Sequence, residues 1–157
     1  MLPKKGLPPE FFDRIASAIP YSFNCSNPNR FSLLGKEFTI FRMDLQKEMR
    51  RSAINKVNEQ NDNEFHLIQT ILSQRHLFPC SLYFQPIVWE YDYTLDLFQF
   101  PHFLIIADRY SGQFYYPFGS AEKKNIHIIN PGSFLKNFSF VVIYPQKGTV
   151  DLCQVPD

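Results

Sequence analysis

The histidines of this sequence are not placed as metal-dependent catalysis requires. His66, His76, His102 and His127 lie far apart, and no two are three or four residues apart, as ligands on one helix are. The patterns His-Glu-x-x-His, Asp-x-His and Gly-Asp-x-x-Asp are absent. Because a two-metal hydrolase needs several carboxylates and imidazoles that converge on its ions, the sequence predicts surface or structural histidines. It predicts no metal and no other cofactor.

Covalent catalysis has equally little support. No Gly-x-Ser-x-Gly elbow occurs, and the 6 glycines are too scattered to form a phosphate-cradling loop. Cys25, Cys80 and Cys153 form no Cys-x-x-Cys pair, which disfavours a zinc site. Three separated thiols are typical of ordinary cysteines in a reducing compartment. We therefore predict no catalytic residue.

One compact box, Asn130-Pro131-Gly132-Ser133-Phe134, contains turn-forming residues between two apolar runs. Proline presets its own φ, and glycine adopts a positive φ at little steric cost. We predict that the box is a structural turn between two strands, with Phe134 pointing back to the core. A ligand-binding loop is the alternative.

The aromatic content is high, with 17 Phe, 8 Tyr and 1 Trp, or 17% of the chain. Such content requires a large core or a buried interface. Aromatic residues are densest between Trp89 and Phe100, where apolar residues recur mostly at every second position. This stretch is interpreted either as an edge strand that packs inward or as a partner-binding surface. For the second alternative the candidate residues are Trp89, Tyr91 and Tyr93, because Trp and Tyr are favoured at binding hot spots.

Charge and hydropathy exclude two classes of partner. The 16 Lys+Arg and 15 Asp+Glu give a net charge of +1, and the basic spots are interleaved with acids. Since nucleic-acid binding depends on a concentrated basic surface, we expect no nucleic-acid groove from this chain alone. The longest apolar run, 103–107, is far shorter than a membrane span, and no apolar segment follows the basic N-terminal residues. We expect neither a membrane segment nor a secretory signal.

The hydrophobic pattern predicts an α+β fold, a mixed α/β sandwich. Residues 1–20 contain four prolines and are expected to form an extended lead-in with one helical turn near 10–18. The remaining residues, 21–157, would form one domain, interrupted by a polar, mobile loop at 55–63. Period-two or continuous apolar runs predict strands at 31–34, 38–42, 103–107, 113–118, 125–129, 138–144 and 149–153.

Helical periodicity predicts two helices that face this sheet. Asp44 is placed to cap the first, at 45–53, and Asn63 begins the second, at 64–74. Phe65, Ile68 and Leu72 follow a core-facing i, i+3, i+7 spacing in the second helix. We expect that stripe to be buried.

Six segments in a fixed order resemble one known family. They are PYS and SNP within 20–28, FTIFRMDL at 38–45, TILSQRHLFP at 70–79, WEYDY at 89–93, PHFLIIADRY at 101–110, and INPGSF at 129–134 with FSF at 138–140. Together they are similar to the C-terminal part of the B subunits of eukaryotic DNA polymerase epsilon. The resemblance covers nearly the whole chain.

That resemblance implies the C-terminal portion of a degenerate calcineurin-like phosphoesterase fold, with an OB domain and the first metal motifs upstream. It further implies a non-catalytic accessory subunit, located in the nucleus. Such a protein binds the C-terminal domain of the catalytic subunit and other proteins of the replication complex. It reaches DNA only through that complex.

The resemblance also assigns positions to the lost metal site. Arg42 stands at or near a position where active phosphoesterases carry a histidine, and arginine cannot ligate a cation because it stays protonated. Asp108 and Tyr110 replace both histidines of the Gly-His-x-His motif that follows a buried strand in active relatives. His76 belongs to a family hallmark box, which is interpreted as structural.

Two alternatives to the accessory-subunit hypothesis are a fragment of a metal-dependent phosphoesterase or nuclease and an unrelated protein-interaction module. A chain that supplies only the later strands of a two-sheet sandwich would also expose apolar surface and an open sheet edge. We therefore expect the isolated chain to self-associate, most simply as a two-fold dimer, or to refold locally and bury its own edge.

Overall fold

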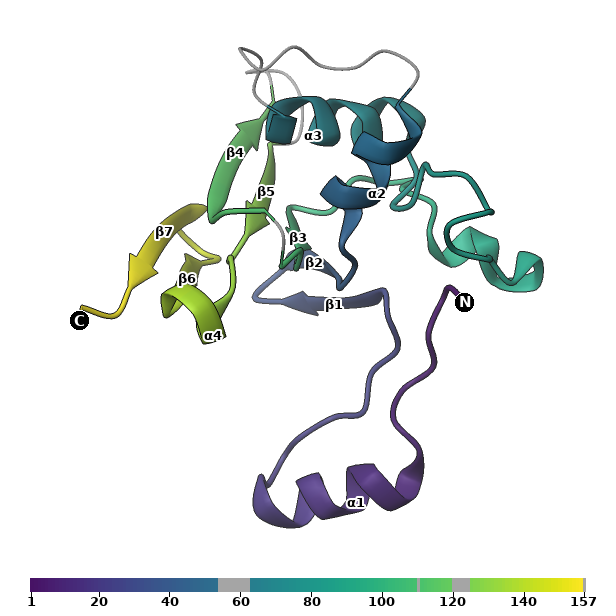
Figure 1. The fold of residues 1–157 in the computed structure, drawn as a ribbon. Helices are drawn as coiled ribbons and strands as arrows, with labels where there is room; N and C mark the ends of the chain where they lie inside the picture. Colours follow the sequence, from purple (N-terminus) through teal and green to yellow (C-terminus); the bar gives the residue numbers. More distant parts are fainter. Residues whose placement is uncertain (54–62, 110, 120–124, 157) are drawn as a thin grey trace.

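A computed structural model describes residues 1–53, 63–109, 111–119 and 125–156. Figure 1 shows the arrangement of its elements. In chain order these are α1 (Pro9–Ala18), β1 (Asn29–Leu33), β2 (Lys36–Phe41), α2 (Leu45–Ser52), α3 (Asn63–Gln74), the 3-10 helix η1 (Trp89–Thr94), β3 (Phe103–Ile106), β4 (Phe114–Phe118), β5 (Ile126–Asn130), α4 (Phe134–Asn137), β6 (Ser139–Tyr144) and β7 (Thr149–Gln154).

A mixed five-stranded sheet, in the order β1-β2-β3-β5-β4, organises the chain. Its three inner strands, β2, β3 and β5, are parallel, whereas β1 and β4 pair antiparallel to them at the two edges. The run Phe103–Ile106 lies centrally, as expected of a short continuous apolar strand. Pro117 lies in edge strand β4, where a missing N–H is tolerated.

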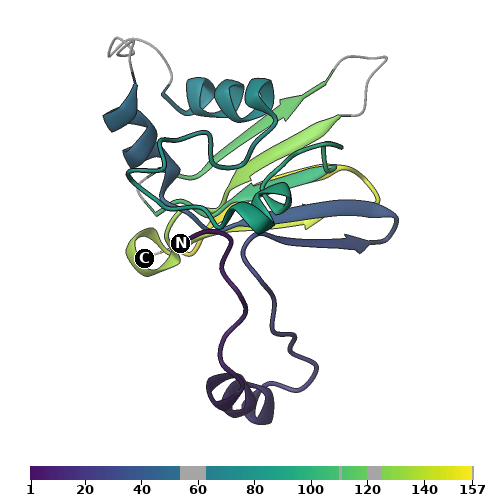
Figure 2. The same ribbon diagram turned by 90° about the vertical axis from the view of Figure 1, so that its right-hand side faces the viewer.

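Two layers cover the sheet, as Figure 2 shows from the side. Leu104 and Ile106 of β3 join the larger apolar core, which includes Leu45 of α2 and Ile68 of α3. The alternate β3 residue Phe103 packs in a second cluster that includes residues of the antiparallel β6–β7 hairpin. This alternation of side chains along β3 places helices on one face of the sheet and the hairpin on the other.

A stack of aromatic rings crosses the hairpin-facing side. Phe31, Phe38, Phe103 and His127 stand at paired positions on β1, β2, β3 and β5. Successive ring centroids are 5.1, 4.7 and 4.8 Å apart, and the rings are nearly parallel. Cross-strand aromatic pairs of this kind stabilise a sheet by packing. Part of the high aromatic content is therefore structural.

The predicted α+β class is confirmed, and the predicted bounds of most helices and strands agree with the structure within two residues. Asp44 does precede α2, but its side chain makes no capping hydrogen bond. Most of the predicted loop 55–63 lies outside the described residues. Within the part of the chain that the structure describes, no helix is long and apolar enough to cross a membrane.

Three local predictions were wrong. The lead-in contains a ten-residue helix, α1, in place of one turn. Of the two interpretations of the aromatic stretch, the edge strand was wrong, because the segment after Val88 forms the 3-10 helix η1 and is followed by the buried residues Leu95 and Leu97. Phe65 is 36% exposed, since the buried side of α3 is formed by Leu67, Ile68 and Ile71.

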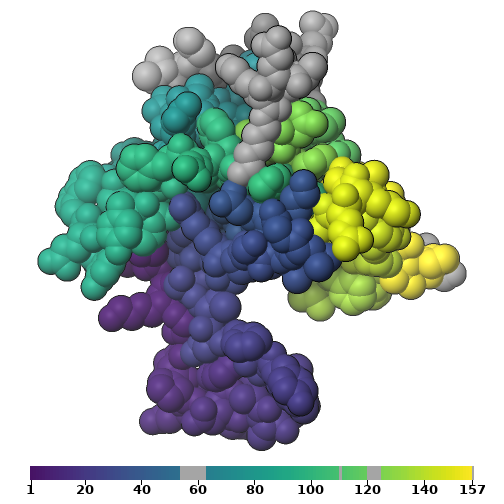
Figure 3. All heavy atoms as spheres, turned by 180° about the vertical axis from the view of Figure 1, so that it is seen from behind, coloured from purple at the N-terminus to yellow at the C-terminus, as the bar shows by residue number. Residues whose placement is uncertain are grey.

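Helix α1 projects from the body on two extended segments (Figures 1 and 3). None of its residues is buried, and Phe11 and Ile15 expose apolar side chains.

Because a net charge of +1 provides little repulsion between copies, the isolated chain should form dimers at micromolar concentration. Sedimentation velocity should show the mass of a dimer, and replacing Phe11 and Ile15 by Ser should reduce the fraction of dimer. Glu10→Gln on the same helix is the control. A stable wild-type monomer that binds no hydrophobic dye would contradict the prediction.

Candidate functional site

The carboxyl ends of β2, β3 and β5 meet at one edge of the sheet, because these three strands are parallel. Arg42 follows β2, Asp108 follows β3 by two residues, and Asn130 is the last residue of β5. Parallel α/β sheets place their functional side chains at such an edge. The structure thus brings together three of the positions that the sequence singled out. Tyr110 lies outside the described residues.

Asp108 is almost fully buried, and its carboxylate accepts backbone hydrogen bonds. Oδ2 accepts from the Gln46 N–H at 2.8 Å, and Oδ1 accepts from the Ser111 N–H at 3.4 Å. A buried carboxylate needs such donors in order to remain in the interior. These bonds connect the end of β3 to the start of α2, so Asp108 contributes to the architecture of the edge.

Asn130 is fully buried and joins β5 to the segment after β3. Its Oδ1 accepts from the Asp108 N–H at 3.2 Å. Its Nδ2 donates to the carbonyls of Asp108, Ser111 and Gly112 at 3.1, 3.4 and 2.8 Å. The amide therefore satisfies several backbone groups that would otherwise be buried without partners.

Replacement of Asn130 by Ala should lower the free energy of unfolding by about 2–3 kcal/mol, because buried carbonyls lose their donor. Chemical denaturation would measure the loss. The slope of the unfolding free energy against denaturant concentration should stay the same. Asn137→Ala, at an exposed position at the end of α4, is the control. Equal stability of the two variants would show that the Asn130 amide contributes nothing.

Asp44 lies between two arginines at the same edge. Its carboxylate is 2.8 Å from Arg42 Nη1 and 3.0 Å from Arg109 Nε. Burial acts to raise the pKa of Asp44, but a hydrogen bond from the Arg109 N–H and the two guanidinium charges lower that pKa overall. The carboxylate is thus held ionised and paired with the guanidinium groups of Arg42 and Arg109.

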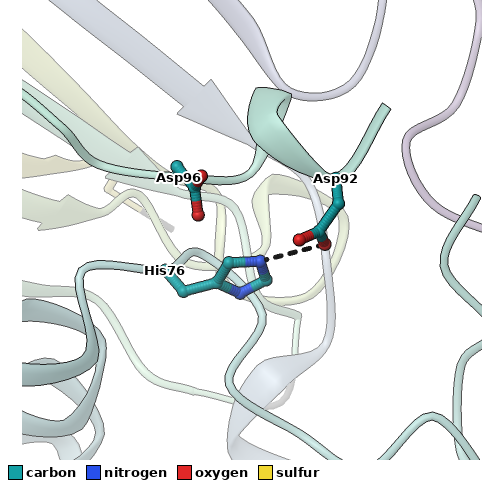
Figure 4. Close-up of side chains that lie close together, drawn as sticks. All are labelled: His76, Asp92 and Asp96. Carbon is teal, nitrogen blue, oxygen red and sulfur yellow. Dashed lines mark hydrogen bonds and ion pairs between the residues drawn. The ribbon is translucent and has the colours of Figure 1, made fainter. Parts of the chain in front are cut away.

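Within the described residues, the one group of three potential metal ligands lies away from this edge. It consists of His76, Asp92 and Asp96, whose ligand atoms are all within 4.8 Å of one another (Figure 4). His76 follows α3, Asp92 lies in η1, and an isolated antiparallel bridge pairs His76 with Asp96. No spacing in the sequence identifies Asp92 and Asp96 as neighbours of His76.

Hydrogen bonds define the orientation of the His76 ring. Nδ1 accepts from the Phe78 N–H at 3.1 Å, and Nε2 lies 3.4 Å from Asp92 Oδ1. In the neutral ring the proton is therefore on Nε2, facing Asp92. A cation on Nε2 would move that proton to Nδ1, toward the Phe78 N–H. This geometry favours a hydrogen-bonded link between α3 and η1 over a cation site.

Trp89, Tyr91 and Tyr93 are exposed on η1, by 69%, 43% and 61%. Their segment is anchored at both ends, because Leu2 exchanges backbone hydrogen bonds with Pro86 and Val88, and Leu95 is buried. Exposed aromatic side chains on an anchored backbone are suited to contact with a partner.

The box after β5 differs in part from its prediction. Gly132 has a φ of +74°, as expected, and a Cβ there would lie 2.6 Å from the buried Ser139 Oγ. Phe134, however, is 55% exposed and begins helix α4, which separates β5 from β6. Its ring packs edge-on against Phe138 at 5.8 Å, so a local contact holds it at the surface. Pro131 and Ser133 are half-buried.

Comparison with known proteins shows the family. Residues 1–115 match the family model that describes the B subunit of DNA polymerases alpha and epsilon. DNA polymerase epsilon subunit 2 of Mus musculus and of Homo sapiens are 37% and 36% identical over 152 residues, 96% of this chain. The B subunit of DNA polymerase epsilon from Arabidopsis thaliana is 36% identical over 97% of the chain. The chain spans 28% of the length of these relatives. The chain belongs to the B-subunit family of DNA polymerases alpha and epsilon.

Proposed function

We propose that this chain is part of a non-catalytic accessory subunit of DNA polymerase epsilon that acts in DNA replication in the nucleus. The similarity to polymerase epsilon subunits over 96% of the chain carries the proposal. The partners would be the C-terminal domain of the catalytic subunit and other replication proteins. The net charge of +1 supports contact with DNA only through the complex.

The carboxyl edge of the sheet supports the non-catalytic part of the proposal. We infer that it is the remnant of a calcineurin-like metal site, with Arg42, Asp108 and Tyr110 at degenerate positions. The carboxylate of Asp108 accepts backbone hydrogen bonds, and that of Asp44 is paired with Arg42 and Arg109. Hydrolysis by two metals would need free carboxylates and imidazoles around the ions.

Metal analysis of the purified chain distinguishes this proposal from a phosphoesterase or nuclease. After incubation with manganese, iron or zinc and desalting, the chain should retain less than one ion per molecule. It should hydrolyse a phosphodiester substrate no faster than buffer does. Stoichiometric metal together with turnover would overturn the non-catalytic assignment. His76→Asn would then report whether the ion binds beside Asp92 and Asp96.

The aromatic residues of η1 are the proposed contact with the catalytic subunit. Trp89→Ala should weaken binding of the C-terminal domain by about 2 kcal/mol, or roughly 30-fold, as loss of a hot-spot side chain does. Tyr91→Ala and Tyr93→Ala should have smaller effects, which isothermal titration calorimetry would measure. Tyr83→Ala, another exposed aromatic residue outside η1, is the control. Equal affinities of the Trp89 and Tyr83 variants would place the contact elsewhere.

The box 130–134 and His76 have structural roles in this proposal. Asn130 and Gly132 would maintain the carboxyl edge, and Pro131, Ser133 and Phe134 would set the path into α4. His76 would hold η1 against α3 through Asp92, and thereby position the aromatic contact. Variants of these residues should therefore alter binding only to the extent that they alter folding.

A further inference from the structure

A polar pocket of about 390 Å³ lies at the amino ends of the inner strands, opposite the edge that carries Asp108. Lys36 begins β2 and His102 precedes β3. Asn125 precedes β5, and His127 is the second residue of that strand. Gln146 and Lys147, from the turn between β6 and β7, complete the polar lining. Four separate segments of the chain therefore converge on this pocket.

Both imidazoles in the pocket have a hydrogen-bond partner at Nδ1. His102 Nδ1 accepts from the Glu37 N–H at 3.0 Å, so the neutral ring carries its proton on Nε2. His127 Nδ1 lies 2.8 Å from the Tyr115 hydroxyl. With that hydroxyl as donor, Nε2 of His127 is also an N–H donor. It faces Gly148, a further residue of the pocket wall.

The electrostatics of the pocket are positive. Lys36 and Lys147 line the pocket, with Lys147 Nζ 5.7 Å from the centroid of the Tyr144 ring, and among the described lining residues none carries a carboxylate. Burial, and then the charge of Lys36, lower the pKa of His127. The carboxylate of Glu37 lies 3.8 Å from His102 Nδ1. This is the ring nitrogen that accepts the hydrogen bond from the Glu37 backbone N–H.

We infer that this pocket binds a phosphate monoester, as carried by a phosphorylated serine or threonine of a protein segment. Two ammonium groups match the charge of the dianion, and imidazole and amide N–H groups match its oxygens. A nucleic acid would need several phosphate contacts along a basic stripe, whereas this site is compact and the chain has a net charge of +1. Free phosphate offers the same chemistry as a second source.

NMR and calorimetric titrations of the full 157-residue chain test the inference. Inorganic phosphate and a phosphoserine peptide should each shift the ring resonances of His102 and His127, whereas the unphosphorylated peptide should not. Tighter binding of the peptide would identify a protein segment as the source, and binding of phosphate alone would identify the free ion. Either outcome supports the pocket.

A variant that lacks both lysine charges provides a second test of the inference. Lys36→Gln combined with Lys147→Gln should weaken phosphate binding at least tenfold, while Lys5→Gln, at an exposed lysine outside the pocket, should leave it unchanged. Circular dichroism would verify that the fold of each variant is intact. Unchanged affinity in the double variant, or an absence of shifts at the two histidines, would overturn the inference. Stronger binding of an oligonucleotide without terminal phosphates would also overturn it.

Discussion

Gly132→Val should lower the free energy of unfolding by about 2–5 kcal/mol. A side chain at a left-handed backbone position costs about 1–2 kcal/mol, and Gly132 has a φ of +74°. Overpacking adds about 1–3 kcal/mol, because the new Cβ would lie 2.6 Å from Ser139 Oγ and 3.4 Å from Gln113 Cβ. Gln113 Nε2 donates to the Phe140 carbonyl, so the clash also reaches β6. Thermal unfolding should show a decrease in Tm of roughly 5–15 °C.

Gly35→Val is the matched control for this substitution. Gly35 has nearly the same φ, +73°, but a Cβ added there would meet no atom of the described residues within 4 Å, its chain neighbours aside. The substitution should therefore cost only the backbone part of the free energy. Equal losses at the two glycines would show that close packing at Gly132 is unimportant. Unchanged stability with loss of partner binding would identify the Gly132 turn as a contact site.

Ile68→Ala should also cost about 2–5 kcal/mol, the usual range for truncating a fully buried aliphatic side chain. Ile68 is 0% exposed and packs in the core between α3 and the sheet. The cavity would open in the same cluster that holds Leu104 and Ile106 of the central strand. Urea denaturation monitored by circular dichroism would measure the change.

Leu72→Ala, on the same helix, is the comparison. The sequence pattern placed Leu72 in the same stripe as Ile68, but the structure leaves it half-buried. Removal of a partly buried isobutyl group should cost about 1 kcal/mol. A larger loss at Leu72 than at Ile68 would mean that α3 is rotated from its position in the structure.

Much of the sheet was predictable because its signals are local. Phe103–Ile106 is a continuous apolar run, and such runs of four to eight residues indicate strands buried on both faces. Gly35, in the short segment between the strands predicted at 31–34 and 38–42, has a positive φ, which is typical of a tight turn. The strand order was not predictable, because the parallel pairing of β2 with β3 joins residues more than sixty positions apart.

The site residues depended on longer-range information. Arg42 and Asp108 were identified through a family resemblance, but the pairing of Asp44 with Arg109 spans 65 residues and follows from the fold alone. Trp89 and Tyr93 were predicted as aromatic candidates, yet their alternation suggested a strand. Both are exposed on η1, whereas Leu95 and Leu97 after it are buried. The local sequence pattern does not distinguish this arrangement from a strand that packs one face against the core.

Binding to the catalytic subunit is the decisive test of the accessory-subunit assignment. The purified chain should be mixed with the C-terminal domain of the catalytic subunit of DNA polymerase epsilon and analysed by sedimentation velocity and calorimetry. We expect a stoichiometric complex with submicromolar affinity that replaces the self-association of the isolated chain. No complex at tens of micromolar, with an intact fold by circular dichroism, would contradict the assignment.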